Sequence, residues 1–275
     1  MSINKILLFG GTGMLGRYVY RYFIKNNLNV CIINYRILDK NFETLEAVLI
    51  KYGIDVDTCV INCIGLIPQR KNDNTNISSD KEYFIINGLF PHILWELCKK
   101  YNAQMIQPST DCVFSGKTGG YIETDLHDEI NAYGMSKSLG EPVGCTIIRT
   151  SIIGLEVQNK KSFLEWVLSN NNKTIQGFTN HYWNGITCLE YCKIIRDIID
   201  KNLFWSGIKH IFSPNVHSKY EIAQMIVNVF ELNIVIEPMQ TDGICDKSLK
   251  SIYINEFNIK DLCEQVKELK EFIIV

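Results

Sequence analysis

Two side chains that share one face of a predicted helix carry the clearest chemical signal in the sequence. Tyr133 and Lys137 are four residues apart, so on a helix the ammonium lies one turn from the phenol. A nearby cation stabilises phenolate and lowers the tyrosine pKa, which allows the phenol to donate a proton to a carbonyl near neutral pH. The pair therefore predicts a proton donor beside a carbonyl substrate.

A second pair, Thr110 and Cys112, lies in a segment predicted to be a strand that runs from Met105 to Phe114. Residues two apart on an extended strand face the same side, so the hydroxyl and the thiol should point into one space, with Asp111 between them. The alternative for Cys112 is a small buried hydrophobe, because free cysteine is often buried and the chain contains 10 cysteines.

The N-terminal residues predict a binding site for a dinucleotide next to these pairs. The apolar run Ile6 to Phe9 is followed by a turn and then by the apolar spacing of a helix. Glycines leave the backbone room at such a turn, where free N–H groups and the positive end of the helix can receive a pyrophosphate. The predicted contacts from this turn are Gly10, Thr12, Gly13, Met14 and Leu15, with Gly16 completing the glycine spacing.

The type of dinucleotide is predicted from the end of the second strand, Val30 to Asn34. In dinucleotide-binding folds this position contacts the adenosine ribose, and NAD-specific sites usually place a carboxylate there. This chain has Arg36 instead, whose guanidinium would pair with the extra phosphate of NADPH. NADPH is thus the predicted cofactor, although Arg36 could be a solvated loop residue and Asp39 keeps NADH open.

The remaining segments predict the elements that position these residues. Cys59 to Gly65 is predicted as a buried strand, with the cofactor over Asn62, Cys63 and Ile64 at its carboxyl end. A polar loop follows at residues 68–80, where Gln69 and Arg70 either reach the diphosphate of a sugar nucleotide or are simply solvated. A long helix is predicted over 82–101, with Pro91 kinking it or marking its start, and another strand over 145–153.

This alternation predicts an α/β fold with a Rossmann-type, doubly wound parallel sheet over residues 1–154. Residues 155–275 are predicted to form a smaller C-terminal α/β lobe that binds the substrate, with the chain crossing between the two parts. The predicted elements of this lobe are helices at 163–168, 189–201, 219–230 and 259–272 and strands at 208–212 and 234–237.

Composition excludes several classes of protein. The 275 residues, 46% hydrophobic, can bury a large core, and a net charge of -2 without a basic tract argues against nucleic acid as a partner. The cysteines follow neither a disulfide ladder nor a C-x2-C zinc pattern, so we expect reduced thiols and no metal. Without an h-region or a run of roughly twenty apolar residues, no membrane association is expected. The expected location is the cytoplasm, or the host cytoplasm if the sequence is viral.

Five motifs resemble the extended short-chain dehydrogenase/reductases of the dTDP-4-dehydrorhamnose reductase type. In chain order they are FGGTGMLG, STDCVFSG, ETD with NAYGMSKSLGE, RTSIIG and SPNVHSKYEIA. The resemblance implies that Thr110, Tyr133 and Lys137 form the catalytic triad. It also implies that Tyr133 and Lys137 contact the cofactor and that the C-terminal lobe binds a nucleotide sugar.

The chain departs from the simple reductases at Cys112, where they carry tyrosine. A cysteine here resembles GDP-fucose synthase and the UDP-4-keto-6-deoxyglucose 3,5-epimerase/4-reductases of plants and giant viruses, which make UDP-rhamnose. A C4 ketone acidifies the hydrogens on C3 and C5, so a thiolate could remove one of them. The family supplies the opposing acid from a segment matching residues 158–166. Lys161 is the favoured candidate here, with Lys160 and Lys173 as alternatives.

The leading hypothesis is therefore an enzyme that epimerises C3 and C5 of UDP-4-keto-6-deoxyglucose and reduces C4 with NADPH. Asp111 and Cys112 are expected to contact the sugar, and Trp183 either stacks on the base or packs in the core. The alternatives are a reductase-only dTDP-4-dehydrorhamnose reductase and a non-catalytic NADP-binding regulatory subunit, as in methionine adenosyltransferase. The resemblance also fits a homodimer formed through helices that flank the sheet.

Overall fold

A parallel sheet of six strands forms the centre of the protein. The structure is a computed structural model that describes residues 3–37, 42–68, 80–156 and 162–274. The strands follow the order β10-β5-β4-β3-β1-β2, so the direction of winding reverses between β1 and β3. This confirms the predicted Rossmann-type parallel sheet. The strands are β1 (Lys5–Phe9), β2 (Val30–Ile33), β3 (Thr58–Asn62), β4 (Gln104–Ser109), β5 (Thr146–Arg149) and β10 (Gly207–His210).

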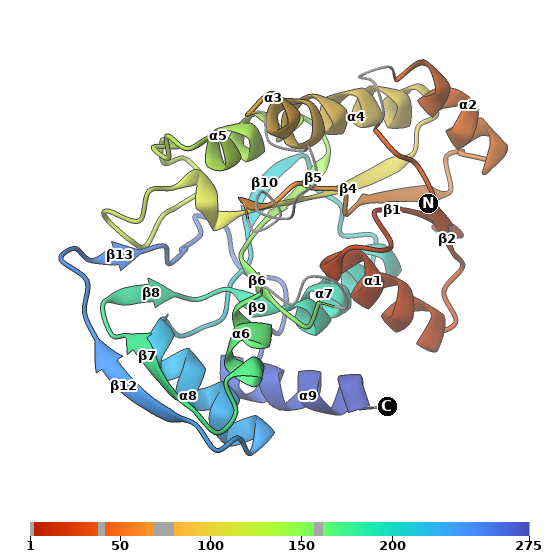
Figure 1. Ribbon diagram of the computed structural model, residues 1–275. Helices are drawn as coiled ribbons and strands as arrows, with labels where there is room; N and C mark the ends of the chain where they lie inside the picture. Colours follow the sequence, from red (N-terminus) through yellow and green to blue (C-terminus); the bar gives the residue numbers. More distant parts are fainter. Residues whose placement is uncertain (1–2, 38–41, 69–79, 157–161, 275) are drawn as a thin grey trace.

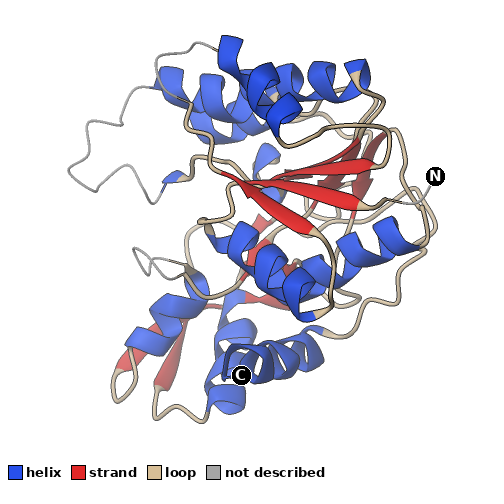
Figure 2. Cartoon of the chain, turned by 90° about the vertical axis from the view of Figure 1, so that its right-hand side faces the viewer, coloured by secondary structure: helices blue, strands red, loops and turns tan. Residues whose placement is uncertain are grey.

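Helices cover both faces of the sheet because successive strand residues point to opposite sides (Figure 2). In β1, Ile6 and Leu8 belong to one buried cluster, while Leu7 and Phe9 belong to the other. The first cluster is covered by α1 (Met14–Lys25) and α7 (Cys188–Asp200), which pack against each other. The second is covered by α2 (Glu43–Lys51) and α4 (Phe90–Lys100), and α5 (Ala132–Leu139) lies in the same layer (Figure 1).

The predicted long helix at 82–101 is continuous but irregular. It consists of α3 (Asp80–Tyr83), a π-helical segment (Phe84–Leu89) and α4. The buried Asn87 of the π-helical segment accepts a hydrogen bond from the Leu66 backbone N–H at 2.8 Å, and its amide nitrogen donates to the Leu66 carbonyl at 2.9 Å. The same nitrogen donates to the Ser136 hydroxyl at 3.2 Å. One side chain thus joins the loop after β3 to α5.

The C-terminal lobe packs below the sheet and beside α1 and α7 (Figure 1). Its small sheets have the orders β11-β8-β13, β12-β7 and β6-β9. The four predicted helices are present; the helix predicted at 219–230 has the predicted bounds, and the ends of the other three are shifted by one to three residues. The elements are β6 (Ile152–Ile153), α6 (Phe163–Ser169), β7 (Thr174–Phe178), β8 (His181–Trp183), β9 (Ile186–Thr187), β11 (His217–Ser218), α8 (Lys219–Phe230), β12 (Val235–Met239), β13 (Cys245–Asp246) and α9 (Leu262–Ile274).

Two elements predicted for this lobe, the helix at 189–201 and the strand at 208–212, belong to the central sheet and its covering layer instead. The strand predicted at 208–212 is β10, and it pairs in parallel with β5 at the edge of the central sheet. Helix α7, which precedes it, packs on α1. Helix α7 and strand β10 thus form a further helix-and-strand unit of the parallel sheet. The chain returns to the central sheet after residue 154 to form it.

Candidate active site

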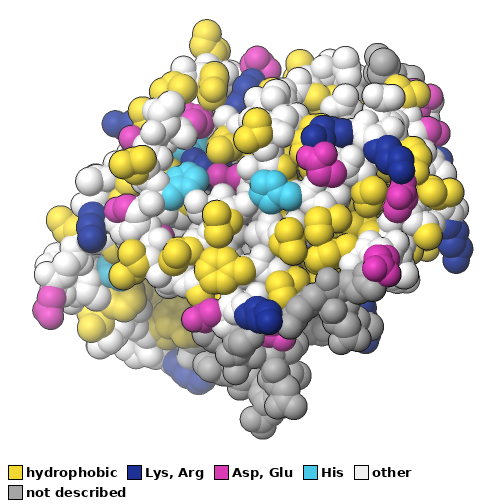
Figure 3. All heavy atoms as spheres, turned by 90° about the horizontal axis from the view of Figure 1, so that it is seen from above, with side chains coloured by type: hydrophobic (Ala, Val, Ile, Leu, Met, Phe, Trp, Pro, Cys, Tyr) yellow, Lys and Arg dark blue, Asp and Glu magenta, His cyan; other side chains and the backbone are white. Residues whose placement is uncertain are grey.

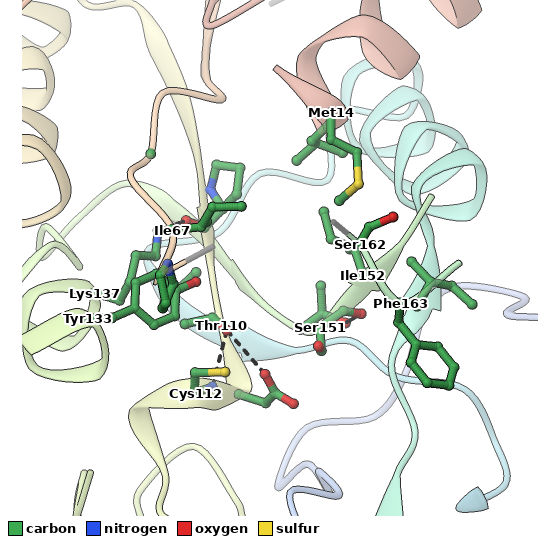
Figure 4. A pocket seen from close by; sticks show the side chains of 18 of the residues that line it. Met14, Ile67, Thr110, Cys112, Tyr133, Lys137, Ser151, Ile152, Ser162 and Phe163 are labelled. Atoms are coloured by element: carbon green, nitrogen blue, oxygen red, sulfur yellow. Dashed lines mark hydrogen bonds between the residues drawn. The ribbon is translucent and has the colours of Figure 1, made fainter. Parts of the chain in front are cut away.

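A cavity of about 600 Å³ lies at the carboxyl ends of β1, β3, β4 and β5, where it also meets the C-terminal lobe. In doubly wound sheets, ligands bind outside the carboxyl ends of the strands at the point where the winding reverses. Figure 4 shows Thr110, Cys112, Tyr133 and Lys137 on one side of this cavity and Met14, Ser162 and Phe163 on the other.

The backbone of the turn after β1 lies very close to the backbone after β3 and to helix α1. Gly10 has a φ of +73°, and a Cβ there would lie 2.6 Å from the carbonyl carbon of Cys63. A Cβ on Gly16 would lie 2.2 Å from the Gly10 carbonyl oxygen, so α1 can approach the turn only with glycine at this position. Helix α1 begins after Gly13 without a side-chain cap or an acidic residue in its first turn. Its first N–H groups are thus not capped by a side chain.

The segment that carries Thr110 and Cys112 is not the extended strand expected from the sequence. Strand β4 ends at Ser109, and Asp111–Val113 forms a 3₁₀ helix. The Thr110 hydroxyl caps this helix by accepting a hydrogen bond from the Cys112 backbone N–H at 3.1 Å, and it donates to Asp111 Oδ1 at 3.1 Å. Thr110 and Cys112 still face one cavity, although a capped turn rather than strand alternation brings them together.

Helix α5 carries Tyr133 and Lys137 to the same wall of the cavity. Its N-cap is Asn131, whose side chain accepts a hydrogen bond from the Gly134 N–H at 2.8 Å. The Lys137 ammonium donates to the Pro108 carbonyl at 2.9 Å, and burial lowers its pKa to about 8, although Glu141 and Cys63 oppose this shift. The predicted fall in the tyrosine pKa is wrong for this state of the protein. Burial, together with Cys112, raises the pKa of Tyr133 well above its usual range, and a hydrogen bond with Thr110 only partly opposes this.

Cys112 lies in a charged corner of the cavity. Burial and Asp111 raise the pKa of its thiol to about 12, although Lys247 and a hydrogen bond with Thr110 act in the opposite direction. Burial also raises the pKa of Asp111, which Lys247 again opposes. Lys247 follows β13, and its ammonium lies 3.4 Å from Glu129 Oε2. Burial lowers the pKa of Lys247, but the negative charges of this corner raise it overall.

A buried ion pair holds the end of β4 and β5 below this corner. Arg149 is fully buried and donates to both carboxylate oxygens of Glu141, at 3.1 and 2.7 Å. Glu141 also accepts a hydrogen bond from the Ser109 hydroxyl at 2.5 Å, directly before Thr110. The remaining guanidinium contacts are His210 and His127, at 2.8 and 2.7 Å. This network fixes the strand ends from which Thr110 and the 3₁₀ helix start.

The structure brings most of the predicted site residues together. The predicted residues that line the cavity are Gly13, Met14, Leu15, Asn62, Cys63, Ile64, Thr110, Asp111, Cys112, Tyr133, Lys137 and Trp183. Gly10 and Thr12 belong to the turn beside it, and Arg36 is exposed after β2. Gln69, Arg70, Asp39, Lys160 and Lys161 lie outside the described residues. Lys173 is exposed between α6 and β7 and is not part of the cavity wall.

Two lysines in the cavity wall were not found by sequence reasoning. Lys247 and Lys219 come from the C-terminal lobe, after β13 and at the start of α8. Lys219 lies in the SPNVHSKYEIA motif, which could have drawn attention to it. No motif surrounds Lys247, which reaches the cavity only because β13 pairs with β8. His181 also lines the cavity.

The fold and this cavity define a Rossmann-type α/β protein of the short-chain dehydrogenase/reductase class, with a tyrosine and a lysine beside the glycine turn. Residues 4–253 match the family described as RmlD substrate binding domain, and the chain belongs to that family. This confirms the predicted reductase family, whereas the resemblance to the UDP-rhamnose-producing enzymes stays a prediction.

Individual relatives of two kinds match the chain. The methionine adenosyltransferase 2 subunit beta of Rattus norvegicus is 24% identical over 249 residues, which cover 83% of this chain and 73% of that protein. The spore coat polysaccharide biosynthesis protein SpsK of Bacillus subtilis is 27% identical over 263 residues, covering 91% of this chain and 88% of that protein.

Solved structures share the fold at low sequence identity. The dTDP-4-dehydrorhamnose reductase of Bacillus anthracis, in complex with NADP, superposes with a TM-score of 0.79 at 19% identity, covering 98% of this chain and 99% of that one. The GDP-l-fucose synthetase of Naegleria fowleri, bound to NADP, has a TM-score of 0.72 at 16% identity, with coverages of 100% and 93%.

Proposed function

We propose that the protein is an NADPH-dependent reductase that acts on the C4 ketone of a nucleotide-linked 4-keto-6-deoxyhexose. The observation that carries this proposal is the meeting of Thr110, Tyr133 and Lys137 in the cavity that also contains the start of α1. A pure binding site has no need of a proton donor at this position. The solved relatives that bind NADP or carry reductase names support the same reading.

The residues present fit a dinucleotide. The close backbone approach at Gly10 and Gly16 and the N-terminus of α1, which no side chain caps, suit a pyrophosphate. Asn62, Cys63 and Ile64 would hold the nicotinamide half at the end of β3. The exposed Arg36 would pair with the 2′-phosphate that distinguishes NADPH from NADH. When bound, the cofactor supplies a hydride to the carbonyl carbon.

The chain's own residues would supply the proton that completes the reduction. With its raised pKa, Tyr133 carries its proton in the unliganded protein and can give it to the carbonyl oxygen as the alkoxide forms. Thr110 would hydrogen-bond the same oxygen or the phenol. Lys137 would stabilise the phenolate left on Tyr133, since an ammonium in a poorly solvated site acts strongly on a nearby anion.

We further propose that the enzyme epimerises C3 and C5 before reduction and that the substrate is UDP-4-keto-6-deoxyglucose. Support comes from Cys112, which faces the same cavity as Tyr133. As a thiolate it would accept the proton from carbon, breaking C–H and forming S–H, while the electron pair moves into an enolate at the ketone oxygen. Asp111 would contact the sugar and Trp183 the base. Lys161 remains the proposed acid on the opposite face of the ring.

A deuterium experiment tests both steps. Wild-type protein incubated in D2O with UDP-4-keto-6-deoxyglucose and NADPH should consume NADPH and yield UDP-rhamnose carrying deuterium at C3 and C5, detected by mass spectrometry. Cys112→Ser should lose the deuterium but still reduce a sugar that is already epimerised. Cys245→Ser, which changes another cysteine of the cavity wall, is the matched control and should behave as wild type. Full deuterium incorporation by Cys112→Ser would exclude the thiol as the base.

Two other functions are distinguished by the same assay. A reductase-only enzyme would turn over dTDP-4-keto-rhamnose rapidly and leave UDP-4-keto-6-deoxyglucose unchanged. A regulatory subunit is favoured by the similarity to the beta subunit of methionine adenosyltransferase 2. It would bind NADPH, detectable by fluorescence, without consuming it in the presence of either sugar.

We also propose that the protein is a homodimer through the helices above the sheet. Figure 3 shows apolar side chains across this face, which is viewed from above Figure 1. On the π-helical segment and α5, Leu89, Met135 and Leu139 are exposed to 48%, 43% and 59%. Burying such side chains against a second copy would remove apolar area from water.

Among the described residues, no helix is both long and apolar enough to cross a membrane.

A further inference from the structure

We propose that Lys247 is the positioning cation that stabilises the thiolate form of Cys112. This inference rests on the proposed epimerase function, in which the thiolate is the base. The ionisation of Cys112 can nevertheless be measured without any sugar. Cys112 and Lys247 belong to distant parts of the chain and line one cavity.

The backbone brings Lys247 to the 3₁₀ helix that carries Cys112. Beyond that helix, Gly116 accepts a hydrogen bond at its carbonyl from the Asp246 N–H at 2.7 Å. A Cβ on Gly116 would lie 3.1 Å from Cγ of Lys247, so the lysine side chain runs directly over this loop. On its other side, the Lys247 N–H donates to the Tyr182 carbonyl at 3.1 Å. Backbone hydrogen bonds on two sides therefore hold the base of this side chain.

The Lys247 ammonium is directed by Glu129, which packs on the backbone of Cys112. The ammonium lies 3.4 Å from Glu129 Oε2. A Cβ on Gly134 would lie 2.4 Å from Cγ of Glu129 and 2.5 Å from the Cys112 carbonyl oxygen. The Glu129 side chain and the Cys112 carbonyl therefore both lie against Gly134 of α5. The Glu129 N–H in turn donates to the Val113 carbonyl at 3.2 Å. Glu129 thus holds the cation beside the 3₁₀ helix.

The charges around Cys112 show why a cation matters here. The ionisable groups that act on the thiol are Asp111 on its own 3₁₀ helix, Lys247 after β13 and Tyr133 on α5. Asp111 opposes a thiolate, and so does the low polarity of the site. Lys247 is the group with opposite charge. Lys219, the other new lysine of the cavity, lies close enough to His181 to lower the pKa of that imidazole.

In this arrangement Lys247 keeps its proton throughout. The thiol loses its proton to solvent, and the thiolate beside the ammonium then takes a proton from carbon and becomes a thiol again. Without the cation, desolvation and Asp111 would raise the pKa of Cys112 further and lower the thiolate fraction at every physiological pH. A residue with this role should change the pH dependence of the thiol.

The test measures the alkylation rate of Cys112 by iodoacetamide between pH 6 and 10, with the modified peptide quantified by mass spectrometry to separate it from the other cysteines. In Lys247→Met the pKa of Cys112 should rise by a unit or more, which lowers its alkylation rate about tenfold throughout this pH range because the thiolate fraction falls by the same factor. Lys247→Arg should restore most of the rate. Lys250→Met removes an exposed lysine three residues further on and should match wild type.

An unchanged alkylation profile in Lys247→Met would overturn the proposal. Lys247→Gln serves as a second variant if the methionine protein does not fold, and circular dichroism checks both. Deuterium incorporation separates this proposal from the proposed function. If wild type exchanges C3 and C5 and Lys247→Met exchanges them equally fast, the role of Lys247 is wrong and the epimerase stands. If wild type exchanges nothing, the epimerase is wrong, and the alkylation profile alone decides on Lys247.

Discussion

Replacing Lys137 by methionine should make the protein more stable while removing its activity. The Lys137 ammonium lies in the cavity wall, where burial lowers its pKa from 10.5 to about 8. Each pKa unit corresponds to about 1.4 kcal/mol, so the charged lysine costs the folded state roughly 3 kcal/mol at neutral pH. Water that reaches the cavity screens part of this, leaving an expected gain of about 2 kcal/mol for Lys137→Met.

Loss of the hydrogen bond from Lys137 to the Pro108 carbonyl should not cancel this gain in stability. The Pro108 carbonyl, which accepts from Lys137, also accepts from the Gln107 side-chain amide at 3.1 Å and keeps that partner in the variant. Methionine occupies a similar volume without a charge. For a chain of this size, about 2 kcal/mol raises the melting temperature by roughly 4 to 8 °C.

The pH dependence identifies the cause of the effect. The folded-state pKa of Lys137 is lowered, so its destabilising contribution is complete below pH 8 and disappears as the pH rises from about 8 towards 10.5. Urea unfolding at several pH values, followed by tryptophan fluorescence, should therefore show a stability gain that shrinks above pH 8. Lys250→Met, at an exposed site, should show no such trend. A gain of equal size at pH 7 and pH 10, or a loss at pH 7, would refute the reasoning.

Four further predictions follow from named contacts. Gly16→Ala places a Cβ 2.2 Å from the Gly10 carbonyl oxygen, so NADPH binding measured by fluorescence should weaken at least about tenfold; unchanged affinity would contradict the tight turn. Arg36→Ala should raise KM for NADPH about tenfold or more and leave KM for NADH unchanged, since it removes a charged hydrogen bond to the phosphate. Tyr133→Phe should bind NADPH normally but lower kcat by roughly 10² to 10⁴, and a smaller loss would show that another group donates the proton. Leu139→Glu, at a side chain 59% exposed, should convert a dimer to a monomer in sedimentation analysis, and an unchanged mass would place any interface elsewhere.

The parts of the fold that depend on local sequence could be predicted. The apolar run of β1 and the following glycines specify a strand, a tight turn and a helix, and the structure has these elements within one or two residues of the expected positions. The spacing of Tyr133 and Lys137 required only a helix, and α5 provides it. Both cases rest on contacts between residues close together in the chain.

The errors arose where distant contacts or turn chemistry decide the structure. A threonine before an aspartate favours a capped turn, and this hydrogen bond ended β4 at Ser109 where strand propensity predicted a longer strand. The edge position of β10 depends on its pairing with β5, more than fifty residues earlier, which no local pattern encodes. Lys247 reaches the cavity that Cys112 lines because backbone hydrogen bonds join Asp246 to Gly116 and Lys247 to Tyr182, and no local pattern in the sequence encodes these contacts.

The π-helical segment has a consequence for how this protein tolerates insertions and deletions. Each residue of an α-helix rotates by about 100° around the helix axis. The wider π turn changes this rotation, so the side chains of α3 point in different directions relative to those of α4 than they would in a regular helix. Deleting one residue from 84–89 would make this helix regular and improve its own hydrogen bonding. It would also rotate the Asn87 amide away from Leu66 and Ser136, which it now joins. The loop after β3 and the helix bearing Tyr133 would then lose the side chain that joins them, so the irregular turn helps to hold these two segments of one cavity wall together.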